Sequence, residues 1–349
     1  STLLASSAAS DVYKRQDYQL VWDVKTAYPT SDYPMGLKFV RHNTYEFYKE
    51  LASAKVIIEN TNIVERLYAY KKKEQFLLQT WHGSLGIKRL DGDVVMGFRW
   101  KQLAKRCQKT VDYLLSNSNF ETEVFRTAYW KDVPSILVGH ARNDIFFIKD
   151  KEKVARINKK VHRFLNIDED THIFLFAPTH RDDVDESYQP LNYEMIKEAL
   201  EERFGGKWQI VIRLHNRLKK ESRSWLNLLP SYVSDATFYE DMQELLLCTD
   251  VGLTDYSSWI FDFVLSGKPG FIIELNLEDY ENARGFYYPI DTTPFPIAMN
   301  SEELAANIRK FDAEKYEKDK DVFLAARGCM EDGHASERIV EKINELMAK

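Results

Sequence analysis

The sequence predicts an α/β protein of two domains, each built on a largely parallel sheet. The 349 residues are more than one ordinary core accommodates, so two domains of common size are expected. From residue 17 onward, short β-branched or apolar runs alternate with helix-length amphipathic stretches, which is the pattern of βα units. Apolar residues make up 44% of the chain, enough to fill two cores and too many for a disordered protein.

The predicted strands fall into two groups, separated by a highly charged stretch with helical spacing at residues 149–163. Ser118 and Glu121 directly follow one strand and form a capping box, so a helix is expected to begin there. The first group of strands is 19–23, 38–40, 55–59, 76–80, 113–116 and 135–138, and the second is 172–177, 209–214, 236–239, 251–253 and 270–274.

We place the domain boundary near the charged stretch, with a first domain over residues 17–155 and a second over residues 156–334. Residues 335–349 are expected to form a closing helix, because Ile339, Val340, Ile343 and Leu346 share one helical face. Residues 1–16 are small and polar without periodicity, and we interpret them as a tail or an artefact.

Composition limits the class of function. The net charge of −6 argues against a dedicated nucleic-acid binder, which usually carries a basic domain. Cys107, Cys248 and Cys329 are far apart and form no CxxC pair, so we expect no metal site, no disulfide framework and a cytoplasmic environment. No apolar run approaches the roughly 18 residues that span a bilayer, so we expect no membrane crossing.

Candidate site residues follow the predicted strands, where open α/β sheets bind ligands. Histidine and arginine side chains there are candidate phosphate ligands, since guanidinium pairs bidentately with phosphate, although each is as open to a structural role. The candidates are Trp81, His82, Gly83 and Ser84 after strand 76–80, His180 and Arg181 after strand 172–177, and Arg213 with His215 at the end of strand 209–214.

The turn Thr254-Asp255-Tyr256-Ser257-Ser258 joins a strand to a predicted helix that Gly267 and Pro269 end. Backbone N–H groups and the helix dipole favour an anion at such a turn, and the two serines can add hydroxyl donors. The turn therefore predicts a phosphate or diphosphate ligand, while plain capping of the helix by serine explains it about equally well.

His82 is a candidate general base. An imidazole is neutral near physiological pH, and the adjacent Gly83 permits close approach of a ligand. The nearby Lys88 and Arg89 supply positive charge that an anionic substrate needs. A purely structural histidine is the alternative.

At these residues the sequence resembles the CDP-glycerol glycerophosphotransferase family, which includes the teichoic acid primases and polymerases and related capsule enzymes. It departs from the family at Ser84-Leu85-Gly86, near which the family usually has a proline, and at His140-Ala141, where the family commonly has Tyr-Pro. The matching stretches keep the family's order: Gln79-Thr80-Trp81-His82-Gly83-Ser84, Ala177-Pro178-Thr179-His180-Arg181-Asp182, Tyr239-x-Asp241 with Glu244-Leu245-Leu246 and Asp250, Thr254-Asp255-Tyr256-Ser257-Ser258 with Phe261-Asp262, and Asn282-x-Arg284-Gly285-Phe286.

The resemblance implies a GT-B fold: an acceptor domain and a nucleotide-donor domain, both Rossmann-like, with parallel sheets facing a central cleft and the last helix packing back on the first domain. It implies a metal-independent transfer of glycerol phosphate or ribitol phosphate from a CDP-activated donor, with release of CMP and no cofactor. The acceptor would be a hydroxyl of a lipid-linked saccharide or of a growing teichoic-acid or capsule polymer.

The resemblance also implies roles for the candidates. His82 would take the proton from the acceptor hydroxyl. His215, Ser257, Ser258 and Arg284 match family positions expected near the donor's diphosphate, and His215 is also the second catalytic candidate. The remaining candidates are assigned to the donor's phosphates (His180, Arg181, Arg213, Thr254 and Asp255) or to the acceptor side (Trp81, Gly83, Ser84 and Lys88).

Two other functions stay open: a GT-B glycosyltransferase that uses a nucleotide sugar, and a binding scaffold without turnover. A lipid-linked acceptor implies peripheral docking on the inner face of the bacterial membrane. Basic clusters such as 71–73 could contact anionic lipid there, although an ordinary solvated helix face is equally expected.

Overall fold

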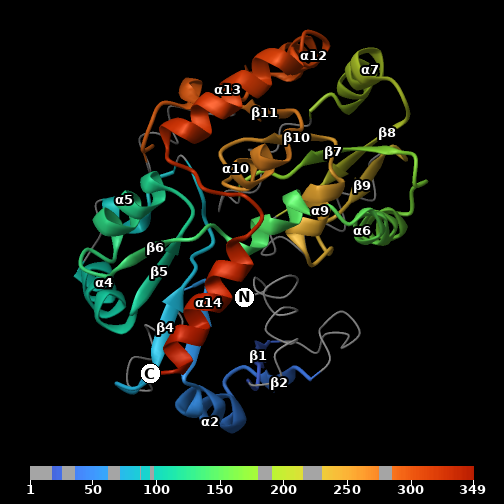
Figure 1. Cartoon of the computed structure of the whole chain (residues 1–349). Coiled ribbons are helices and arrows are strands. Elements are labelled where there is room, and N and C mark those ends of the chain that lie inside the picture. Colours follow the sequence, from blue (N-terminus) through green and yellow to red (C-terminus); the bar gives the residue numbers. More distant parts are fainter. Residues whose placement is uncertain are drawn as a thin grey trace. The chain divides into compact units, whose positions relative to one another are not determined.

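The computed structural model describes residues 18–25, 36–61, 71–86, 88–94, 98–179, 191–214, 230–274 and 285–349 (Figure 1). The chain forms two compact units. The first unit comprises Ser1–Gly83, Arg89–Phe147 and Arg327–Lys349, and the second comprises Ser84–Lys88 and Ile148–Ala326. The short segment after Gly83 thus belongs to the second unit, although the chain on both sides of it belongs to the first.

A four-stranded parallel sheet forms the centre of the first unit, in the order β3-β4-β5-β6. Its strands are β3 (Val56–Glu59), β4 (Phe76–Gln79), β5 (Tyr113–Ser116) and β6 (Ser135–Leu137), and β1 (Val21–Val24) pairs separately with β2 (Lys38–Arg41). Both faces of the larger sheet are covered, which explains why its strands appear in the sequence as continuous apolar runs.

Successive leucines of the central strands pack into two separate hydrophobic cores, one on each face of the sheet, because side chains alternate across a strand. Leu77 and Leu114 pack on one face of the sheet with Trp130. Leu78 and Leu115 pack on the other face, in the same cluster as Ile339, Ile343 and Leu346 of α14 (Ala335–Met347). Figure 1 shows α14 lying along this sheet beside β4. The other helices of this unit are α2 (Tyr45–Ser53), α4 (Phe98–Thr110), α5 (Asn119–Ala128) and the 3₁₀ helices η3 (Asp91–Asp93) and η4 (Ala141–Phe147).

The capping box expected at Ser118 forms in part. Ser118 Oγ accepts a hydrogen bond from the Glu121 backbone N–H at 3.0 Å and so caps α5. The Glu121 carboxylate, however, accepts from the Asn117 N–H at 2.9 Å, one residue before the cap. Glu121 is thereby fixed in a buried position, where it also contacts the His140 ring at 3.0 Å.

The second unit contains a six-stranded parallel sheet in the order β12-β11-β10-β7-β8-β9. The chain builds outward from β7 through β8 and β9, and then returns to β10 on the other side of β7. The boundary between β7 and β10 is therefore a topological switch point, where the loops at the carboxyl ends of the strands diverge. The strands are β7 (His172–Phe176), β8 (Trp208–Ile212), β9 (Val233–Asp235), β10 (Val251–Thr254), β11 (Gly270–Ile273) and β12 (Ile297–Ala298).

The helices of the second unit pack beside this sheet, and α7 contacts α12 extensively. They are α6 (Lys151–Leu165), α7 (Tyr193–Phe204), α9 (Met242–Cys248), α10 (Ile260–Phe263), α12 (Ser301–Arg309) and α13 (Ala313–Ala326), with 3₁₀ helices η6 (Val264–Ser266) and η7 (Ile290–Thr292). Within the ranges that the structure describes, no helix is both long and apolar enough to cross a membrane.

One local expectation is wrong, and another is met by a shorter helix. The strand expected over residues 236–239 lies three residues earlier, because Asp235 Oδ1 accepts from the Thr237 N–H at 2.7 Å and turns the chain there. The helix after the Thr254–Ser258 turn is a single α turn followed by a 3₁₀ turn. It ends where expected, at Gly267, whose φ of +71° suits glycine.

Candidate functional site

The loop after β4 carries His82 on a strained backbone. Trp81 has a φ of +54°, a conformation that costs a bulky residue of the order of 1 to 3 kcal/mol. The surroundings hold it there: the Trp81 N–H donates to Gln79 Oε1 at 2.9 Å, and its ring packs against Trp130 with centroids 5.4 Å apart. Strain maintained in this way at a strand end indicates a functional loop.

The His82 ring is exposed and oriented. Its Nδ1 lies 2.7 Å from the Asn60 backbone carbonyl oxygen, which can only accept a hydrogen bond. In the neutral ring the proton therefore sits on Nδ1, and Nε2 carries the lone pair. The Trp81 ring supports the imidazole, with centroids 4.2 Å apart. This arrangement suits a side chain that accepts a proton at Nε2.

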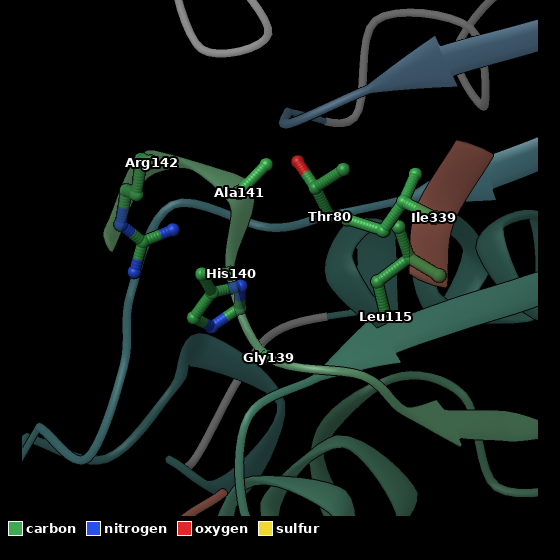
Figure 2. Close-up of a pocket in the computed structure, with 7 residues that line it drawn as sticks. All are labelled: Thr80, Leu115, Gly139, His140, Ala141, Arg142 and Ile339. Carbon is green, nitrogen blue, oxygen red and sulfur yellow. The ribbon is translucent and has the colours of Figure 1, made fainter. Parts of the chain in front are cut away.

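Arg142 braces the same loop from the segment after β6. Arg142 is buried, and its Nη2 donates a hydrogen bond to the backbone carbonyl of Gly83, the residue that follows His82. A small cavity lies beside this contact, at the carboxyl ends of β4 and β5. Figure 2 shows its lining, in which Thr80 from the end of β4 and Ile339 from α14 meet the segment Gly139–Arg142. The sequence did not predict Arg142 as part of the site.

A half-buried acidic residue, Glu331, links this segment to the C-terminal part of the chain. Glu331 accepts hydrogen bonds from Asn117 Nδ2 at 3.0 Å, from Asn143 Nδ2 at 2.9 Å and from the His140 N–H at 3.2 Å. Burial raises the pKa of the Glu331 carboxyl above its ordinary value. The neighbouring Asp144 accepts from the first N–H groups of α14. Sequence reasoning missed this cluster, because Glu331 is separated from its partners by 188 to 214 residues.

In the second unit, Thr179 and Asp255 meet at the switch point between β7 and β10. Thr179 donates to Asp255 Oδ1 twice, from its backbone N–H at 2.8 Å and from its hydroxyl at 2.7 Å. Asp255 is almost fully buried, and its Oδ1 also accepts from the Tyr256 N–H. Thr254 Oγ1 donates to the Ala177 carbonyl at 2.8 Å. The two strand ends are thereby joined through side chains as well as through the sheet.

Ser257 and Ser258 are partly exposed at the turn before α10. The cap residue of α10 is Trp259, and no side-chain hydrogen bond caps the helix, so the serines are not explained by capping. Because α10 is a single turn, its dipole is weak, and hydroxyl and backbone N–H donors are the groups that the turn can offer to an anion.

Arg213 holds the loop that follows β9. Its Nη1 donates to the carbonyls of Tyr239 and Ala236, and burial lowers the pKa of its guanidinium. Its predicted phosphate contact stays a prediction. His180, Arg181, His215 and Arg284 lie outside the described residues.

The structure thus groups the predicted residues by unit. Trp81, His82 and Gly83 belong to the first unit, and Thr254, Asp255, Ser257 and Ser258 belong to the second. Ser84 and Lys88, predicted on the acceptor side, lie in the second unit, where Lys88 Nζ donates to Thr179 Oγ1 at 2.8 Å. In the part of the chain that the structure describes, no group of three or more His, Cys, Asp or Glu side chains could hold a metal ion.

Comparison with known proteins gives a consistent set of similarities. A family model described as CDP-Glycerol:Poly(glycerophosphate) glycerophosphotransferase matches residues 3–345, and so reaches into the segment interpreted as a tail. The chain is 28% identical over 342 residues to a teichoic acid poly(glycerol phosphate) polymerase of Staphylococcus epidermidis, covering 94% of this chain and 46% of that protein. It is 29% identical over 346 residues to a teichoic acid glycerol-phosphate transferase of Staphylococcus aureus, covering 95% of this chain and 86% of that protein.

Among solved structures, the chain is similar to the wall teichoic acid polymerase TagF. The TM-score is 0.78 at 26% sequence identity, and the match covers 97% of this chain and 84% of that chain. The fold is therefore GT-B, with parallel sheets, as the sequence predicted.

Proposed function

Because the chain belongs to the CDP-glycerol:poly(glycerophosphate) glycerophosphotransferase family, we propose that it transfers glycerol phosphate from CDP-glycerol to an acceptor hydroxyl and releases CMP. Ribitol phosphate from CDP-ribitol is the alternative transferred unit. The acceptor is a lipid-linked saccharide or a growing teichoic-acid or capsule polymer, reached by peripheral docking on the inner face of the bacterial membrane. Support comes from the relatives of S. epidermidis and S. aureus, both named for glycerol phosphate.

The observation that carries the proposal is the orientation of His82. With Nδ1 fixed on the Asn60 carbonyl, Nε2 takes the proton from the acceptor hydroxyl as its oxygen attacks the β-phosphorus of the donor. A bond forms between that oxygen and the β-phosphorus, the bond from the β-phosphorus to the bridging oxygen breaks, and CMP leaves with the bridging oxygen. Such a transfer needs positioning and anion stabilisation more than unusual side chains.

The donor is assigned to the switch point of the second unit, since open α/β sheets bind ligands at the carboxyl ends of strands where the order reverses. The Thr254–Ser258 turn follows β10 at this edge, and Ser257 and Ser258 are partly exposed there. The residues proposed to form the diphosphate site, by contact or by holding its turn, are Thr254, Asp255, Ser257 and Ser258, together with His180, Arg181, Arg213, Arg284 and, as a second catalytic group, His215.

A panel of donors tests the proposal. A ligand that binds only the folded protein raises its melting temperature, so CDP-glycerol, CDP-ribitol and UDP-glucose are compared at equal concentration. We expect stabilisation by a CDP-polyol, followed by CMP release when a lipid-linked acceptor is added. Stabilisation by UDP-glucose alone would favour a glycosyltransferase, and CDP-glycerol binding without CMP release on any acceptor would favour a scaffold.

A further inference from the structure

Residues Ser84–Lys88, here called the strap, follow the His82 loop and belong to the second unit. Ser84 and Leu85 are buried, and the Tyr288 hydroxyl donates to the Leu85 carbonyl. Lys88 forms an antiparallel bridge with Phe286. The strap is therefore fixed at both ends by residues of its own unit.

The strap lies directly on the turn proposed to bind the donor. A Cβ placed on Gly86 would come within 3.2 Å of the Ser258 Cβ, closer than ordinary van der Waals contact. Glycine permits this approach because it has no side chain. The position of the strap and the position of Ser258 are thus mutually dependent.

Lys88 connects the strap to the same turn through a chain of three polar groups. Its Nζ donates to Thr179 Oγ1 at 2.8 Å, and Thr179 Oγ1 donates to Asp255 Oδ1 at 2.7 Å. The direction of these bonds is unambiguous, because an ammonium group can only donate and a hydroxyl has one proton to give. The Lys88 charge therefore fixes the Thr179 hydroxyl toward Asp255 and polarises its bond to the buried carboxylate.

We propose that Lys88 is a positioning residue for the donor: acting through the Thr179 hydroxyl, it holds the buried Asp255 carboxylate and so the geometry of the Thr254–Ser258 turn. This assignment replaces the acceptor contact that the sequence suggested for Lys88. It rests on the proposed function, because the turn is taken to hold the donor's diphosphate.

A double-mutant cycle tests the proposal. Lys88→Met and Thr179→Val keep the approximate length or shape of each side chain but remove the ammonium group and the hydroxyl. The dissociation constant of CDP-glycerol is measured by calorimetry, and the KM of each substrate and kcat are measured by CMP release. We expect each single variant to weaken donor binding about tenfold, and the double variant to weaken it by about the same factor, because one interaction chain is lost in every case. Thr179→Ser keeps the hydroxyl and should bind the donor as the wild type does. In all of these variants the KM of the acceptor should change little.

The matched control is Lys310→Met, which removes an exposed lysine of the same unit at the end of α12 and should bind the donor as the wild type does. Multiplying effects, about a hundredfold in the double variant, or a raised acceptor KM with unchanged donor binding would overturn the role of Lys88 while leaving the proposed function intact. A wild-type protein that binds no CDP-polyol would refute the proposed function and this inference with it.

Discussion

Replacing His82 by glutamine removes the imidazole from the loop after β4 and leaves a polar side chain that can still donate to the Asn60 carbonyl. The wild-type bond at 2.7 Å contributes about 0.5 to 1.5 kcal/mol, which favours the Nδ1–H tautomer by a factor of roughly 2 to 13. The larger loss is that of the base, since general-base catalysis contributes about 10² to 10⁴ in rate, or about 3 to 5 kcal/mol. We expect His82→Gln to lower kcat by that factor.

CMP release at saturating donor and acceptor measures the kcat of His82→Gln, and calorimetry measures its affinity for CDP-glycerol. Donor affinity should stay within about threefold of the wild type, because the lost group acts on the acceptor proton. His334→Gln, at an exposed histidine of the same unit, serves as the control for general effects of the substitution. A kcat within tenfold of the wild-type value would show that His82 is not the base.

Three further predictions concern the surroundings of the site. Gly86→Ala should weaken CDP-glycerol binding about threefold to tenfold by calorimetry, because its Cβ would displace Ser258 by a few tenths of an ångström, and unchanged affinity would show that the turn does not hold the donor. Glu331→Ala leaves three buried donors without their acceptor, so it should lower the free energy of unfolding, measured in urea, by about 3 kcal/mol or more. Glu331→Gln keeps an acceptor oxygen and should lower the free energy of unfolding much less. Burial raises the pKa of Glu331 above its ordinary 4.5, so its contribution to stability is full below pH 4.5 and is lost as pH rises through the folded-state pKa. The stability of the wild type should therefore fall relative to that of Glu331→Gln above pH 4.5. Parallel curves of stability against pH for the two proteins would contradict the raised pKa.

The parallel α/β fold was predictable because buried strands appear as continuous apolar runs with little ambiguity, whereas the family was recognised from its ordered motifs. The run at 113–116 coincides with β5, and those at 76–80 and 172–177 exceed β4 and β7 by one residue. The two-residue β12 was missed, because an edge strand of that length has no pattern of its own. The expected position of β9 was wrong for a different reason: the apolar residues 236–239 belong to the turn after Asp235, and apolar residues alone do not distinguish a strand from the turn that follows it.

Candidate site residues can be picked from the sequence where a polar group closely follows a strand, as His82 follows β4 and Asp255 follows β10. Partners that lie far away along the chain were not. Lys88 follows the His82 motif by six residues, and nothing in that spacing shows that its ammonium group contacts Thr179, 91 residues later. Sequence patterns indicate which face of an element is buried, but the pairing of polar groups depends on tertiary packing.

The departure from the family at residues 139–144 illustrates this distinction. Arg142, Asn143 and Asp144, which match the family pattern, contact the Gly83 carbonyl, Glu331 and the first turn of α14 respectively. His140 stands where the family commonly has tyrosine, and its ring pairs with the carboxylate of Glu121, which also accepts from the Asn117 N–H. The three matching residues thus hold the His82 loop, Glu331 and the start of α14, whereas His140 fills a buried position beside Glu121. On this argument the departure at His140 concerns a buried contact with Glu121 and leaves the proposed chemistry at His82 unchanged.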